Sequence, residues 1–350
     1  MSWATASSEV KPLFALAETL LDEIQTATQE VDAPTVRRDG SERRWALMRR
    51  VISAGLVIAC LMGASYVFGA VSDFQGFWPI PDLKALKQTG TAFVPANGAI
   101  SDKYNRLVGF RDKEQVECPE QTDRTMVLLL VGQSNAANSG GQRYIGRQDV
   151  INFFDGKCYA ASSPLLGTSG IGGEAWTLLG NKLVERQIAD RVVLVPAAIS
   201  GSSISLWREG GSFYPMLEGV LAAVKPRYTV THVLWHQGET DFADGMTKGE
   251  YIDSFASIVA LLRRTGVKAP IYVSITTRCE PDEPVWRADN SIAEAQRELV
   301  DPSKKILAGV DTDLHVGSFD RTDDCHLAQS GQEKFADAWI DILRGRQPEH

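Results

Sequence analysis

The sequence Met126-Val127-Leu128-Leu129-Leu130-Val131, followed at once by Gly132-Gln133-Ser134-Asn135, decides the fold class of this chain. A continuous apolar run of this length is typical of a strand that is buried on both faces, as in the parallel sheets of α/β proteins. The carboxyl ends of such strands are where open α/β sheets place their ligands. The run therefore predicts a central strand that delivers Ser134 to a functional edge.

Strand-like and helix-like segments alternate from about residue 125 onward, which predicts a parallel sheet covered by helices on both faces. The expected strands cover residues 126–131, 192–196, 230–235, 271–275 and 306–310, and the expected helices cover 174–187, 214–224, 248–264, 285–299 and 331–343. The fold class is thus α/β, a three-layer α/β/α sandwich with a mainly parallel sheet, over residues 121–346.

A separate apolar segment near the N-terminus predicts one transmembrane helix over residues 51–72. It carries no charge from residue 51 to 71, and an uninterrupted helix of that length spans the hydrocarbon layer of a bilayer. Six arginines between residues 37 and 50 precede it, so the positive-inside rule places the N-terminus in the cytoplasm. A core helix would show a polar face, and a cleaved signal peptide would have a shorter charged region, so an uncleaved signal-anchor is favoured.

The expected span divides the rest of the chain into an inner and an outer part. Residues 1–50 form a cytoplasmic segment with a short amphipathic helix, and residues 10–30 are a candidate contact for a cytoplasmic partner. Residues 73–120 contain scattered prolines and are expected to form a connector. The main domain then lies on the outer side of the cytoplasmic (inner) membrane, periplasmic or extracellular. A formal net charge of −8 argues against nucleic-acid binding.

The cysteines fit an oxidising compartment. Cys60 lies in the apolar span, and the other four lie on the expected outer side: Cys118, Cys158, Cys279 and Cys325. An even number predicts two disulfides, with three pairings open and four unpaired thiols as the alternative. Because Cys279 follows an expected strand and Cys325 precedes His326, both would lie at the carboxyl edge of the sheet. We favour the pairs Cys279–Cys325 and, by exclusion, Cys118–Cys158.

Ser134 is a candidate nucleophile, which needs a base within hydrogen-bond reach and an acid that orients the base. Of the five histidines, His326 alone has an aspartate three residues earlier, Asp323, in a loop that precedes an expected helix. A short turn can fold this carboxylate back to the imidazole. On spacing alone, a turn serine and two solvated loop residues are the alternatives.

Two further strings follow expected strands. Residues 235–241 contain Gln237, whose amide can donate to a developing oxyanion, and Gly238, which permits close backbone approach. Residues 198–204 contain Gly201, whose backbone N–H is not covered by a side chain. Because all these strings would converge on one edge of a parallel sheet, together they favour a hydrolytic site over unrelated turns.

The strings resemble the sequence blocks of the SGNH (GDSL-like) hydrolase superfamily and, within it, of the sialate O-acetylesterase-like carbohydrate esterases. The similar blocks, in the family's order over roughly residues 125–345, are Gly132-Gln133-Ser134-Asn135, Ser200-Gly201-Ser202-Ser203-Ile204 with Trp207, Gln237-Gly238-Glu239, and Asp323-x-x-His326-Leu327 with Gly331. The chain departs from the pattern at Ser200, where the family often has glycine.

The resemblance implies ester hydrolysis on an acetylated carbohydrate, with no metal and no organic cofactor. It implies that Ser134 attacks the acetyl carbonyl, that His326 is the base, and that Asp323 orients the base. The oxyanion would be held by the backbone N–H groups of Ser134 and Gly201 and by the Gln237 side chain. The remaining candidates, for substrate binding, are Gln133, Trp207, Glu239 and Arg278.

Two other functions stay open at this point. One is an SGNH-type polysaccharide O-acetyltransferase, which would use the same serine but pass the acetyl group to a glycan hydroxyl. The other is a non-catalytic carbohydrate-binding relic. Every catalytic position keeps a competent side chain, which argues against the relic.

Overall fold

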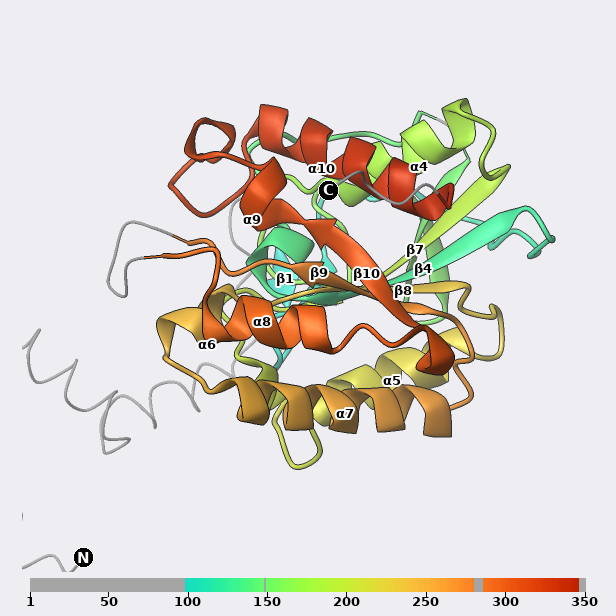
Figure 1. Ribbon diagram of the computed structural model, residues 1–350. Coiled ribbons are helices and arrows are strands. Elements are labelled where there is room, and N and C mark those ends of the chain that lie inside the picture. Colours follow the sequence, from blue (N-terminus) through green and yellow to red (C-terminus); the bar gives the residue numbers. More distant parts are fainter. Residues whose placement is uncertain (1–97, 148, 280–285, 346–350) are drawn as a thin grey trace, which may run out of the picture. The chain divides into compact units, whose positions relative to one another are not determined.

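The computed structural model describes residues 98–147, 149–279 and 286–345, all of which belong to one folded unit (Figure 1). Within these residues, eight strands form one sheet in the order β10-β9-β8-β4-β7-β5-β6-β3. The strands are β3 (Gln115–Val116), β4 (Thr125–Gly132), β5 (Val150–Phe154), β6 (Lys157–Ala160), β7 (Arg191–Ala198), β8 (His232–His236), β9 (Ile271–Ile275) and β10 (Ile306–Asp311). Neighbours from β10 to β5 are parallel, and β6 and β3 add an antiparallel edge.

Helices cover both faces of this sheet, with α4 and α10 on one side and α5, α7 and α8 on the other (Figure 1). The helices are α4 (Trp176–Glu185), α5 (Tyr214–Val224), α6 (Glu239–Ala243), α7 (Lys248–Arg264), α8 (Ser291–Glu298), α9 (Thr312–His315) and α10 (Gln329–Leu343). Short 3-10 helices are η1 (Ser134–Ala136), η2 (Ile204–Leu206), η3 (Pro302–Lys304) and η4 (Ser318–Asp320). The expected parallel sheet between two helix layers is therefore confirmed.

The apolar run of β4 is continuous because the strand is buried on both faces. Successive side chains alternate, so Val127, Leu129 and Val131 pack on the side of α5, α7 and α8. Met126, Leu128 and Leu130 pack on the side of α4 and α10. All eight residues of β4 are buried, which makes this strand the centre of the core.

One helix begins later than its sequence pattern predicts, and one hairpin is not indicated by the pattern. The helix expected over 285–299 begins at Ser291, because the Asn290 side chain accepts hydrogen bonds from the N–H groups of Ile292 and Ala293 and caps it. The hairpin of β5 and β6 was not predicted. It turns at Asp155 and Gly156, both of which have positive φ.

Part of the expected connector over 73–120 belongs to the folded unit. Strands β1 (Ile100–Ser101) and β2 (Leu107–Gly109) form a small antiparallel pair, and β3 pairs with β6 in the main sheet. The disulfide Cys118–Cys158 joins the same region to β6. The sequence boundary at residue 121 thus lies inside the fold.

The segments expected to be cytoplasmic (1–50) and transmembrane (51–72) lie outside the described residues. In the part of the chain that the structure describes, no helix is both long enough and apolar enough to cross a membrane.

Two histidines of β8 make the fold sensitive to acid. Burial lowers the pKa of His232 to about 4 and that of His236 to about 3. In the unfolded chain both imidazoles regain the ordinary pKa of about 6.5. At pH values between the native and the unfolded pKa of each histidine, the unfolded state binds more protons than the native state. The free energy of unfolding therefore decreases as the pH falls through this range.

We expect each of these histidines to reduce the free energy of unfolding by up to about 1.4 kcal/mol per pH unit below about pH 6.5. Urea denaturation at pH 7, 6 and 5 measures this slope. His232→Asn, which can keep the hydrogen bond to Thr231, should remove the contribution of His232. A variant whose stability falls as steeply as that of the wild type would contradict this explanation.

Candidate active site

Three strands end at the same level of the sheet and carry three of the predicted strings. Gly132 of β4 pairs with Ala198 of β7 on one side and with His236 of β8 on the other. Because the three strands are parallel, the segments that follow them begin side by side at the carboxyl edge. The loop between α9 and α10, which contains the fourth string, lies at this edge too (Figure 1).

Gly132 allows the backbone to pack closely at this point. It has φ +153°, and a Cβ built there would overlap the carbonyl oxygen of His236. The same carbonyl accepts a hydrogen bond from the N–H of Gln133 at 3.1 Å. On the other side, the N–H of Ile199 donates to the Gly132 carbonyl at 3.0 Å. A side chain at Gly132 would separate the strand ends that form the site.

Ser134 is the first residue of η1 and is 4% exposed. The N–H groups that begin a helix have no acceptor within it, so the Ser134 N–H can serve a ligand. Gly201 is exposed, with φ +66°, and no heavy atom lies within 4 Å of a Cβ built on it. These two backbone N–H groups are candidate oxyanion donors.

The structure brings Asp323 and His326 together, as their spacing predicts. Asp323 Oδ2 lies 2.7 Å from His326 Nδ1, and Asp323 Oδ1 accepts the His326 backbone N–H at 2.8 Å. Although partial burial raises the pKa of Asp323, the hydrogen bonds from the ring and the backbone of His326 outweigh it and hold this pKa below its usual value. The carboxylate therefore stays charged and orients the imidazole.

The loop that carries this pair is anchored to the sheet by a disulfide and by an arginine. Cys325 is bonded to Cys279, which follows β9, and this is the pairing favoured from the sequence. Arg321, 7% exposed, donates to the carbonyl oxygens of Cys325 at 2.5 Å, Arg278 at 3.2 Å and Thr312 at 3.3 Å. The loop is thus fixed against β9 and α9.

The side chain of Asn135 joins the Ser134 segment to the histidine loop. Its Nδ2 donates to the carbonyl oxygen of Cys325 at 3.2 Å, and its Oδ1 accepts the N–H of Leu327 at 3.1 Å. These two residues flank His326, and Asn135 directly follows Ser134. One amide therefore sets the position of His326 relative to Ser134. The local sequence around Asn135 does not indicate this role, because both partners lie about 190 residues away.

No hydrogen bond joins Ser134 Oγ to the His326 ring, both of which the structure describes. Hydrogen bonds between a nucleophile and its base are often long without substrate and tighten in the reacting complex. The structure therefore shows Asp323 and His326 paired and Ser134 held in the adjoining segment.

Glu239 supports this arrangement from within the core. It is 1% exposed, and its Oε1 accepts from Asn135 Nδ2 at 3.0 Å and from Thr276 Oγ1 at 2.9 Å. Burial raises the pKa of Glu239 above its usual value. Glu239 is thus a buried partner of Asn135, and its role in substrate binding stays a prediction.

Gln237 also occupies a different position from the one expected. It is fully buried, and its Nε2 donates to Gln133 Oε1 at 3.2 Å, to the Ser202 carbonyl at 3.0 Å and to the carboxylate of Asp241. An amide nitrogen has only two hydrogens, and the protein's own acceptors already engage them. In this structure Gln237 joins the Gly201 loop to Gln133, and its contact with an oxyanion stays a prediction.

The remaining candidates for substrate binding are structural or lie beside the loop. Gln133, 2% exposed, accepts the N–H groups of Gly238 and Thr240 at the start of α6. Trp207 is fully buried, and its indole donates to Ser202 Oγ at 3.0 Å. Arg278 is half-buried; its guanidinium donates to Ser318 Oγ at 2.7 Å and stacks on Trp286 at 4.9 Å.

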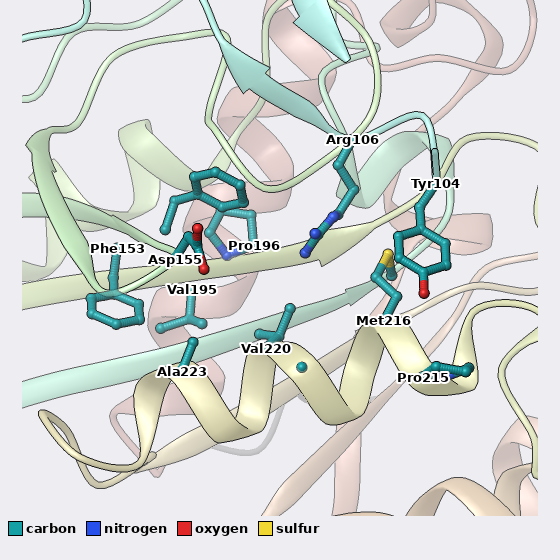
Figure 2. Close-up of a pocket in the computed structure, with 12 residues that line it drawn as sticks. Tyr104, Arg106, Phe153, Asp155, Val195, Pro196, Pro215, Met216, Val220 and Ala223 are labelled. Carbon is teal, nitrogen blue, oxygen red and sulfur yellow. The ribbon is translucent and has the colours of Figure 1, made fainter. Parts of the chain in front are cut away.

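A cavity of about 150 Å³ lies elsewhere, between α5, β7 and the turn after β5 (Figure 2). None of the predicted site residues lines it. Arg106 lines it, but its guanidinium is paired with Asp102 at 2.8 Å and lies between the rings of Tyr104 and Phe154. The candidate active site is therefore the carboxyl edge and not this cavity.

A mainly parallel sheet between two helix layers, with a serine after its central strand and an Asp-His pair in its last loop, fits a carboxylic ester hydrolase. The chain belongs to the family described as "Carbohydrate esterase, sialic acid-specific acetylesterase", whose model matches residues 124–341. The resemblance found in the sequence is thereby confirmed. Comparison with curated protein sequences gives no match.

Solved structures are similar to this chain at low sequence identity. A protein from Arabidopsis thaliana is 18% identical with a TM-score of 0.51, over 63% of this chain and 98% of its own. The psychrotrophic esterase EstA from Pseudoalteromonas sp. is 16% identical with a TM-score of 0.40, over 64% and 98%. The acetylxylan esterase Axe2 from Geobacillus stearothermophilus is 16% identical with a TM-score of 0.42, over 64% and 97%.

Asn135→Ala should lower kcat for ester hydrolysis by roughly a hundredfold with a smaller change in KM, because a base displaced by about 1 Å costs that much. Glu239→Gln is the matched control, since an amide there still offers an acceptor to Asn135 and should lower kcat much less. Steady-state kinetics and a thermal melt of each variant separate misplacement from unfolding. A folded Asn135→Ala variant with wild-type kcat would contradict the positioning role.

Proposed function

We propose that this protein removes O-acetyl groups from a carbohydrate by a Ser134-His326-Asp323 mechanism. The observation that carries the proposal is the 2.7 Å contact between His326 Nδ1 and Asp323 Oδ2, in a loop that Asn135 ties to the segment of Ser134. The family match supports an acetylated sugar as the substrate.

The mechanism follows the usual chemistry of a serine hydrolase. Ser134 Oγ attacks the acetyl carbonyl while His326 Nε2 accepts its proton, and the charge of Asp323 stabilises the imidazolium. His326 then returns the proton to the leaving sugar oxygen, which leaves an acetylated serine. A water attacks this ester in the same way, releasing acetate and restoring Ser134.

The oxyanion is held in this proposal by the backbone N–H groups of Ser134 and Gly201. Both lie at the carboxyl edge, and each donor of this kind contributes about 2.7–4 kcal/mol to transition-state stabilisation. Gln237 acts indirectly, because its amide holds the Gly201 loop through Ser202 and Asp241.

The 350-residue chain should hydrolyse 4-nitrophenyl acetate, and Ser134→Ala should lower kcat by at least about a thousandfold. Ser303→Ala, in η3 before β10, is the control. Near wild-type activity in Ser134→Ala would overturn the mechanism.

Product analysis with acetylated glycans distinguishes the alternatives. Release of acetate supports the esterase, whereas transfer of the acetyl group to an added acceptor glycan identifies an acetyltransferase. Glycan binding without turnover identifies a non-catalytic module. O-acetylated N-acetylneuraminic acid and an O-acetylated methyl xyloside are suitable first substrates.

We further propose that residues 51–72 anchor the enzyme in the cytoplasmic membrane with the esterase domain outside. The uncharged run and the arginines before it support this arrangement. After carbonate extraction of cell membranes, the chain should stay in the pellet, and deletion of residues 51–72 should release it. Recovery of the undeleted chain in the supernatant would overturn the anchor.

A further inference from the structure

Three serines from separate segments meet beside Gly201. Ser200 directly precedes Gly201, Ser139 lies five residues after Ser134, and Ser169 belongs to the glycine-rich loop 167–173. The Oγ atoms of Ser139 and Ser200 are 3.2 Å apart, and Ser169 Oγ donates to Ser200 Oγ at 3.0 Å. We call Ser139 and Ser200 the hydroxyl pair.

The buried end of this cluster fixes the direction of its hydrogen bonds. Ser169 is fully buried, and its Oγ accepts the backbone N–H of Ser200 at 2.7 Å, so its own hydrogen goes to Ser200 Oγ. A hydroxyl has one hydrogen to donate. The hydroxyl pair therefore retains two hydrogens, of which at most one joins Ser139 to Ser200. At least one donor faces outward, and the chain of hydroxyls polarises it.

The outward end of the cluster lies in solvent at the rim of the site. Ser200 is exposed and Ser139 is half-buried, in contrast to Ser169. Two residues after Ser139, the N–H of Gly141 donates to the Leu327 carbonyl at 2.8 Å, next to His326. The hydroxyl pair thus adjoins Gly201 on one side and, two residues beyond Ser139, the backbone that contacts the histidine loop on the other.

We propose that the hydroxyl pair is a subsite that hydrogen-bonds the polyhydroxylated alcohol part of the substrate and so selects sugar acetates over simple acetates. This inference rests on the ester hydrolysis proposed above. It adds the residues that form hydrogen bonds with the leaving sugar alcohol. Sugar ring and hydroxyl oxygens accept the outward hydrogen, and sugar hydroxyls donate to the serine lone pairs. An aryl leaving group without hydroxyls offers neither partner.

The test compares the sugar-to-aryl ratio of kcat/KM between the wild-type 350-residue chain and its variants. For each variant, kcat/KM is measured for the better of the two sugar acetates named above and for 4-nitrophenyl acetate. Ser139→Ala and Ser200→Ala should each lower the sugar-to-aryl ratio by roughly threefold to tenfold, the range expected for one neutral hydrogen bond. Ser303→Ala, at the opposite edge of the sheet, should leave the ratio unchanged.

The effects of the two substitutions should also be non-additive, because the hydroxyls bond to each other. An unchanged ratio in both variants, or an equal loss on both substrates, would overturn the subsite.

A binding measurement separates failure of the subsite from failure of the proposed function. In the Ser134→Ala background, calorimetry with the same sugar acetate should show weaker binding when Ser139→Ala is added. Equal affinity with and without Ser139→Ala overturns the subsite whatever the turnover. Absence of hydrolysis by the wild type, with this loss of affinity intact, overturns only the esterase mechanism.

Discussion

The register of β4 with its parallel neighbours is the constraint on which the active edge depends. Gly132 stands level with Ala198 and His236, so the segments of Ser134, Gly201 and Gln237 start from one line. This register is stable because the side chains of β4 are buried on both faces, and a slip by one residue would exchange the faces. The absence of a side chain at Gly132 lets the strand ends meet.

A buried network of hydrogen bonds fixes the histidine loop relative to the segment of Ser134. Asn135 bonds to the backbone on both sides of His326 and, behind it, to Glu239, which Thr276 also holds. Such groups are costly to bury unless they are paired, so the network specifies one arrangement of the loop. The Cys279–Cys325 disulfide and Arg321 support the loop from the other side.

The elements with strong periodic or apolar patterns could be predicted, and those that depend on partners could not. The strand expected over 126–131 lies within β4. The helix expected over 248–264 has the same bounds as α7. Strand β5 was missed because Asn152 interrupts its apolar run. In the fold, the Asn152 side chain is buried and bonds to the backbone of Leu166 on both its oxygen and its nitrogen.

The sequence by itself determined the fold class, the family and the Asp323–His326 spacing, because apolar runs, block order and a three-residue turn are local properties. Only the tertiary structure decided which polar side chains are buried and which partners they bond. Gln133, Trp207, Gln237 and Glu239 all stand in the motifs, yet they are buried and bonded within the protein. Burial and hydrogen-bond partners arise from residues distant in the chain, and no local pattern encodes them. For the same reason, the roles of Asn135 and of the hydroxyl pair emerged only from the fold.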